Sequence, residues 1–104
     1  MSENFEKLWS EIRNTLQEGQ VIKYWGQARG YSGRSFKISR IQNSFIVIDS
    51  PTAKNLQVIP KNDFEKVWEI WEKYLSGKIF RYEIRDECTR FSSYIISIYR
   101  ELKV

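Results

Sequence analysis

Positive charge is concentrated in the middle of this 104-residue chain. Residues 21–61 contain seven basic residues and one acidic residue, which gives this segment a net charge of +6. The flanking segments 1–20 and 62–76 each contain two basic and four acidic residues. Residues 77–104 have a net charge of +2, so the whole chain has a net charge of only +4. Clustered lysine and arginine side chains are typical of surfaces that bind the phosphate groups of nucleic acids.

The most distinctive part of this basic block runs from Gly26 to Ser35 and contains three glycines and two arginines. Glycine allows a close approach of the backbone to a ligand, and Arg29 and Arg34 can each bind a phosphate through two hydrogen bonds. The segment has no Gly-Lys-Ser/Thr sequence and no helix is expected after it, which excludes a Walker loop and a dinucleotide-binding fingerprint. The alternative is a flexible connection whose glycines only serve turn geometry.

Aromatic residues are interspersed with these basic residues, and aromatic rings beside cations form platforms on which exposed bases stack. The sequence therefore predicts a nucleic-acid-binding site that holds the phosphate backbone with little sequence preference. Its residues are Lys23, Trp25, Arg29, Tyr31, Arg34, Lys37 and Arg40. A second interpretation remains open, since basic residues on a strand also protect sheet edges and the aromatic rings can belong to the core.

The residue types argue against an enzyme. The chain has no histidine, which removes histidine acid–base catalysis, serine–histidine and cysteine–histidine nucleophiles, and most zinc sites. Asp49 follows an expected strand, as in many metal-dependent nucleases, but the next strand has Gln57 where a second acid is needed. Cys88 has acidic neighbours, which raise the pKa of a thiol. We therefore expect no catalytic residue, no metal and no cofactor.

Hydrophobic spacing predicts the elements that position these residues. Apolar residues three and four apart predict a helix from Ser2 to Glu18, which ends at Gly19. Asn43 and Ser44 predict a hairpin turn within the strand region. The run that follows this turn, residues 45–48, is apolar on both faces and predicts a central strand. Runs rich in β-branched and aromatic residues predict strands at 21–25, 36–41, 45–48 and 56–59.

Helical spacing returns after the strands. Residues 62–76 form an amphipathic stripe, with Asn62 and Glu65 as a capping box and Gly77 as the end. Alternating residues predict a short strand over 79–84, and a final helix is expected over 92–102. The predicted fold is a single α+β domain over residues 1–104. It has an N-terminal helix, an antiparallel sheet of three to four strands, and two C-terminal helices on one sheet face.

The sequence also predicts where the protein resides. No run approaches the roughly 18 apolar residues of a membrane helix, and the N-terminal residues do not form a signal peptide. A single cysteine is typical of a reducing environment. We therefore expect a cytoplasmic protein without a membrane partner.

Other function classes stay open. Four tryptophans in a short chain favour either a core of large residues or an exposed aromatic surface, which would serve protein–protein interaction or homodimerisation. An aromatic pocket for a small ligand is a further alternative. The stretch from Asp63 to Tyr99 resembles small domains carried by mobile elements and defence systems, without a motif that defines a family. No function is carried over from this resemblance. A small metal-dependent nuclease or a ligand-binding domain of a mobile element stays among the alternatives.

Overall fold

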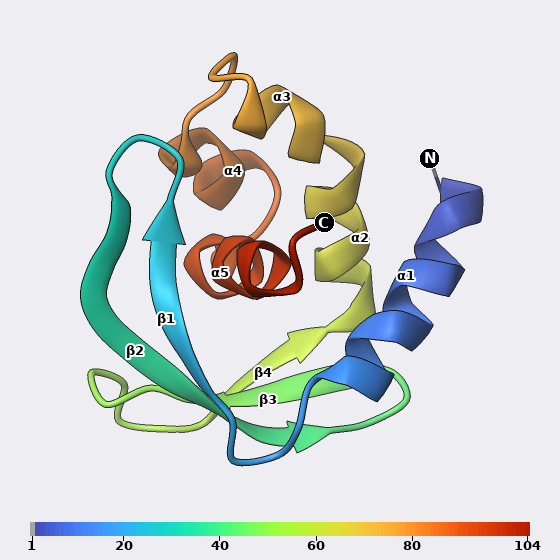
Figure 1. Ribbon diagram of the computed structural model, residues 1–104, viewed down its shortest axis with the longest axis vertical. Helices are drawn as coiled ribbons and strands as arrows, with labels where there is room; N and C mark the ends of the chain where they lie inside the picture. Colours follow the sequence, from blue (N-terminus) through green and yellow to red (C-terminus); the bar gives the residue numbers. More distant parts are fainter. Residues whose placement is uncertain (1) are drawn as a thin grey trace.

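The computed structural model describes residues 2–104, with side chains from residue 5 onward. A long N-terminal helix is followed by four strands and then by four shorter helices (Figure 1). The helices are α1 (Ser2–Thr15), α2 (Lys61–Glu69), α3 (Trp71–Leu75), α4 (Arg81–Glu87) and α5 (Ser92–Leu102). The strands are β1 (Val21–Gly26), β2 (Gly30–Ile41), β3 (Phe45–Asp49) and β4 (Gln57–Pro60).

The four strands form one antiparallel sheet in the order β1-β2-β3-β4. Its register pairs Ile22 with Phe36 and Ile46 with Ile59, and all four side chains are buried. Because successive side chains along a strand point to opposite faces, these residues define an inner face toward the helices. Exposed Lys37, next to Phe36, lies on the opposite face.

Strand β2 is long, with 12 residues, and its register shifts against both neighbours. One shift lies between Ile38 and Arg40 and the other faces the interval between Lys23 and Trp25, so both leave extra residues in β2. Such irregularities bend a strand and increase its twist. The β1–β2 hairpin therefore curves away from β3 and β4 and rises beside α5 toward α4 (Figure 1).

Helix α5 occupies the middle of the core, beside β1 and packed on α2 (Figure 1). Its residues Ile95, Ile96, Ile98 and Tyr99 have no exposed surface. A helix that is covered on several sides must be apolar around most of its circumference, which explains this run of consecutive buried residues. They belong to one continuous hydrophobic cluster that also contains the inner face of the sheet and the apolar stripe of α1.

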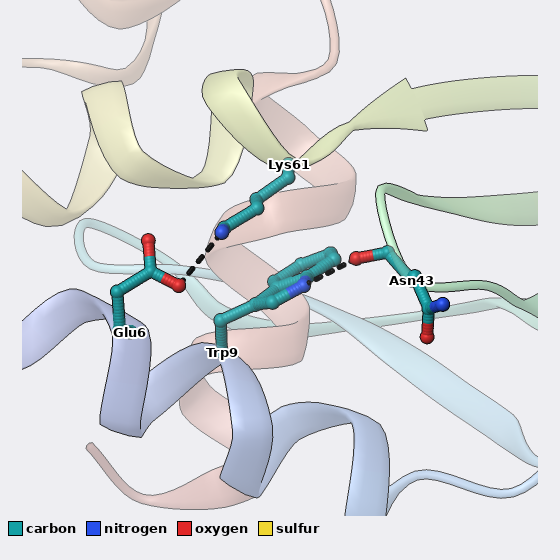
Figure 2. Close-up of polar contacts among 4 residues, drawn as sticks. All are labelled: Glu6, Trp9, Asn43 and Lys61. Atoms are coloured by element: carbon teal, nitrogen blue, oxygen red, sulfur yellow. Dashed lines mark hydrogen bonds and ion pairs between the residues drawn. The ribbon is translucent and has the colours of Figure 1, made fainter.

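Helix α1 is fixed to the rest of the molecule by polar contacts at the rim of its apolar stripe, as Figure 2 shows. The Trp9 indole N–H donates a hydrogen bond of 2.8 Å to the backbone oxygen of Asn43 in the β2–β3 turn. The Lys61 ammonium group at the start of α2 lies 2.7 Å from a Glu6 carboxylate oxygen. Since the Trp9 ring also packs on Phe64, with ring centroids 5.2 Å apart, α1 covers the open end of the core.

The α+β class predicted from the sequence is confirmed. The N-terminal helix, the hairpin turn at Asn43 and Ser44, and the inner position of the strand at 45–48 are all present. The final helix also has the predicted bounds, Ser92–Leu102. The sheet has four strands, and the helices pack on its inner face.

The predicted helix over 62–76 is two helices, α2 and α3, with a break at Ile70. The Ile70 N–H donates to the carbonyl oxygen of Val67, which tightens the chain at the break. The predicted capping box of Asn62 and Glu65 is wrong. The residue before the helix is Pro60, which still pairs with β3, so β4 runs directly into α2 and Asn62 lies inside the helix.

The predicted short strand over 79–84 is also wrong, because this segment leads into helix α4. The alternation of Phe80, Tyr82 and Ile84 does not mark a buried face, since Ile84 is buried while Phe80 and Tyr82 are more than half exposed. The helix begins after Phe80, whose backbone N–H donates to a Glu83 carboxylate oxygen at 3.3 Å. The segment after α3 therefore contributes a helix in place of a strand.

The four tryptophans contribute mainly to the core. Trp9 and Trp71 are each 3% exposed, and Trp25 and Trp68 are half-buried against the same cluster. Within residues 2–104, no helix combines the length and apolar character needed to cross a bilayer.

Candidate functional site

A groove of about 600 Å³ lies at the end of the β1–β2 hairpin. The hairpin forms one wall, from Tyr24 through the turn to Arg34. The segment from Ile79 to Arg81 and the first turn of α5 form the other walls. This volume lies within the usual range of ligand sites in proteins, about 300–1,000 Å³.

The hairpin that builds this wall is shaped by its glycines. Gly26 and Gly30 are paired across the two strands, and residues 27–29 form the turn. Gly30 has φ +73° and Gly33 has φ +86°, values that residues with a Cβ adopt only with strain. The segment expected as a glycine loop, Gly26 to Ser35, is therefore mostly the first half of β2, and only its turn is irregular.

Three arginines line the groove, and no aspartate or glutamate side chain does. Arg29 lies in the hairpin turn, Arg34 on β2 and Arg81 at the first position of α4. All three residues are exposed. The three arginines thus come from two distant parts of the chain, and among the side chains that the structure describes no carboxylate lines the groove with them.

Aromatic rings form the floor and sides of the same groove. The Tyr24 and Tyr94 ring centroids are 5.9 Å apart, and those of Trp25 and Tyr74 are 6.4 Å apart. The Arg100 guanidinium lies over the Trp25 ring, 4.7 Å from its centroid. One face of Trp25 is therefore occupied within the protein, which leaves its remaining surface to the groove.

Backbone and side-chain hydrogen bonds hold the walls in place. The Gln27 backbone N–H donates to the Tyr74 hydroxyl oxygen at 2.8 Å, and the Gln27 side-chain amide donates to the Leu75 carbonyl oxygen at 3.2 Å. On the other side of the groove, the Trp25 backbone N–H donates to the Ser97 hydroxyl at 3.0 Å. That hydroxyl donates to the Ser93 carbonyl oxygen at 2.7 Å. The turn and β1 are thereby tied to α3 and α5.

The Tyr24 hydroxyl connects the groove to the loop after β3. It shares a hydrogen bond of 3.2 Å with the buried Ser50 hydroxyl, which in turn shares one of 3.2 Å with Thr52. Burial raises the pKa of the Tyr24 phenol, and the Ser50 hydrogen bond and the nearby charge of Arg34 oppose this rise. The phenol is therefore a neutral, hydrogen-bonding group near neutral pH.

The structure divides the site residues predicted from the sequence. Trp25, Arg29 and Arg34 line the groove. Tyr31 pairs with Trp25 across the hairpin but lies outside the groove, with 55% of its surface exposed.

The remaining three predicted residues lie away from the groove. Lys23 and Lys37 are exposed on the outer face of the sheet, next to the buried residues Ile22 and Phe36. Exposed Arg40 lies opposite Val47, beyond the register shift of β2. The basic block thus divides between a groove and an open sheet face.

Phe80 is a groove residue that the sequence does not predict. Arg81, which the sequence favours only in a separate candidate pair with Arg85, lies in the groove, and Arg85 does not line it. The alternating pattern over 79–84 favoured a strand and hid their position at the start of a helix. The useful signal was Gly77, which has φ +81° and ends α3, so that the chain turns back toward the hairpin.

The candidate catalytic groups are dispersed. Asp49 is exposed at the end of β3, whereas an Asp63 carboxylate oxygen accepts a hydrogen bond of 2.8 Å from the Thr89 hydroxyl. Burial, and then the Glu87 charge, raise the pKa of the Cys88 thiol, in the direction that the sequence predicts. Among the side chains of residues 5–104, no three acidic or cysteine groups lie close enough to share a metal ion.

Comparisons of the chain with protein-family models, curated proteins and solved structures gave no match.

Proposed function

We propose that this domain binds nucleic acid without catalysing a reaction on it, and that the groove between the β1–β2 hairpin and the helices is its binding site. The observation that supports this proposal is the convergence of Arg29, Arg34 and Arg81 on a groove that has aromatic walls and no carboxylate lining. Arginine binds phosphate through paired N–H groups, and aromatic rings stack on bases. A nucleotide chain presents a phosphate and a base at each of its units, so it can use both the arginines and the aromatic rings.

The three arginines are available for a ligand. Among the side chains that the structure describes, ion pairs form between Lys61 and Glu6 and between Arg85 and Asp86, and the groove arginines take part in neither. Their charges are not neutralised by a contact within the protein. Polyanion binding would supply that neutralisation and release counterions from the nucleic acid.

The outer sheet face has a secondary role in this proposal. Lys23, Lys37 and Arg40 lie outside the groove but add to the positive field around it, which increases the rate of encounter with a polyanion. Specific contacts are assigned to the groove, and the outer cations act at longer range. The proposal includes the cytoplasmic location that the single cysteine favours.

The test is a fluorescence anisotropy titration of labelled DNA and RNA, single- and double-stranded, at 50 and 200 mM salt. The variant Arg29→Ala/Arg34→Ala removes two groove charges, and Lys23→Ala/Lys37→Ala is the matched control with the same change in net charge. If both arginines contact phosphates of single-stranded nucleic acid, each contact contributes about 0.7 to the slope of the logarithm of the binding constant against the logarithm of the salt concentration. Arg29→Ala/Arg34→Ala should therefore flatten that slope by about 1.4. The control variant should have a clearly smaller effect.

Four results would contradict the proposal. Equal losses in the two variants would mean that charge acts diffusely and that the groove is not the site. A mononucleotide that binds as tightly as an oligonucleotide would assign the groove to a small ligand. A tight dimer in sedimentation with no affinity for nucleic acid would favour the interaction module, and metal-dependent cleavage lost in Asp49→Ala would favour the nuclease.

A further inference from the structure

Phe80, which lines the groove, and its neighbour Tyr82 are two exposed aromatic residues to which the proposed function assigns no specific role. Phe80 is 53% exposed and Tyr82 is 55% exposed. Their ring centroids lie 5.7 Å apart with an angle of 7° between the ring planes, so the rings are stacked in parallel. The pair thus presents a flat aromatic surface to solvent, which we call the Phe80–Tyr82 platform.

The local backbone explains how residues two apart can stack. Within a helix, side chains at i and i+2 point in different directions. Phe80 precedes α4 and has an extended backbone, with φ −105° and ψ 159°, whereas Tyr82 lies in the first turn of the helix. This change of backbone conformation turns the Phe80 ring alongside the Tyr82 ring.

The Phe80–Tyr82 platform continues the groove outward. Phe80 and Arg81 both line the groove, and Tyr82, which does not, stacks on Phe80 and so extends the aromatic surface past the groove lining. The nearest acidic residue in sequence, Glu83, accepts a hydrogen bond from the Phe80 backbone N–H. A nucleic-acid strand whose phosphates lie on the groove arginines would therefore pass an exposed aromatic surface beside Arg81. The negative charge of that strand is complementary to the positive charge of the arginines.

We infer that the nucleic acid bound by this protein is single-stranded, and that a base leaving the groove stacks on the Phe80–Tyr82 platform. This inference rests on the proposed function. Bases in a duplex are stacked on one another, so only an unpaired base can lie flat on a protein ring. The groove arginines hold the backbone, while the Phe80–Tyr82 platform selects for exposed bases of any sequence.

The experiment compares three labelled ligands of about 12 nucleotides, a length within the range of known single-strand sites. They are a mixed-sequence single strand, its duplex, and an abasic strand with the same phosphates and no bases, each prepared from DNA, and the first two also from RNA. The variants are Phe80→Ala/Tyr82→Ala and, as a matched control that removes two similarly exposed apolar side chains outside the groove, Leu56→Ala/Val58→Ala. The substituted side chains are all exposed, and unchanged thermal unfolding verifies that each variant is folded.

We expect the wild type to bind the single strand, of DNA or RNA, more tightly than the duplex or the abasic strand. The double alanine variant should lose at least about 5-fold in affinity for the single strand, keep its affinity for the abasic strand, and retain the salt slope. Leu56→Ala/Val58→Ala should bind as the wild type does.

The inference is overturned if the double alanine variant binds the single strand as the wild type does, or if the duplex binds equally well. In either case the groove proposal stands as long as Arg29→Ala/Arg34→Ala still weakens binding. If none of the ligands binds the wild type, the proposed function fails together with the inference.

Discussion

The Tyr99 hydroxyl lies in the centre of the core and donates a hydrogen bond to the Phe64 carbonyl oxygen, 2.5 Å away. The residue has no exposed surface. Burial, with a smaller contribution from the Glu65 charge, holds the pKa of this phenol well above its ordinary value of 10.0. Ionisation of Tyr99 is therefore easier in the unfolded chain than in the folded protein, which connects folding stability to alkaline pH.

The sign and size of this effect follow from proton linkage. Above pH 10 the unfolded chain loses the Tyr99 proton while the native protein keeps it, so the free energy of unfolding falls as pH rises. For an unfolded pKa of about 10, the loss is about 0.4 kcal/mol at pH 10 and about 1.4 kcal/mol at pH 11. Below about pH 9 the contribution is constant.

The measurement is urea unfolding at pH 8, 10 and 11 for the wild type, Tyr99→Phe and the exposed control Tyr82→Phe. At pH 8, Tyr99→Phe should lower the free energy of unfolding by about 1 kcal/mol, because it removes one buried hydrogen bond. At pH 11 this difference should vanish or reverse, since phenylalanine cannot ionise. Tyr82→Phe should follow the wild type throughout. A constant difference between Tyr99→Phe and the wild type from pH 8 to 11 would refute the reasoning.

Two further predictions concern packing and reactivity. Ile46→Ala should lower the free energy of unfolding by about 2–5 kcal/mol in urea, because Ile46 has no exposed surface. Val58→Ala on the neighbouring strand, where the side chain is 50% exposed, should change it by no more than about 0.5 kcal/mol. A large effect at Val58 would show that the outer sheet face is covered in solution. Cys88, whose raised pKa disfavours the thiolate, should react with iodoacetamide at pH 8 more slowly in the native protein than in the urea-unfolded protein, and equal rates would contradict the assigned environment.

The sequence predicts well those elements whose spacing of apolar residues follows directly from how each element is buried against the core. Helix α1 has one apolar stripe because it covers one end of the core, and β3 is apolar on consecutive residues because it is an inner strand. Helix α5 has a long buried run because it lies at the centre of the core. In each case burial imposes a pattern of apolar residues, and this pattern is visible in the sequence alone.

The break at Ile70 and helix α4 are set by longer-range contacts. No proline or glycine lies between Lys61 and Leu75, so local sequence gives no reason for the break. The Trp71 indole N–H after it donates to the Val104 carbonyl oxygen at 2.9 Å, a contact with the far end of the chain. Apolar and charged residues alternate near Phe80 with the period of a strand. The two rings in this pattern are exposed, with Phe80 directly before α4 and Tyr82 in its first turn.

The candidate site was predictable only in part for a related reason. Arg29 and Arg34 lie in one hairpin, so their neighbourhood follows from the sequence. Arg81 joins them because the chain turns at Gly77 and brings the start of α4 to the hairpin. Gly77 signals the turn, but the sequence does not show which element the chain then meets. Whether Lys37 lies in the groove or on the opposite face depends on the pairing register, because a shift of one residue exchanges the two faces.

The contact between β1 and α5 has a consequence for self-association. Exposed strand edges are templates on which other molecules add strands and aggregate. The Trp25 N–H of the edge strand β1 is used by Ser97 of α5, and the opposite edge, β4, is only four residues long and ends in Pro60, which has no N–H. Both margins of the sheet are thereby protected, so this small, aromatic-rich chain is poorly suited to fibril growth by strand addition.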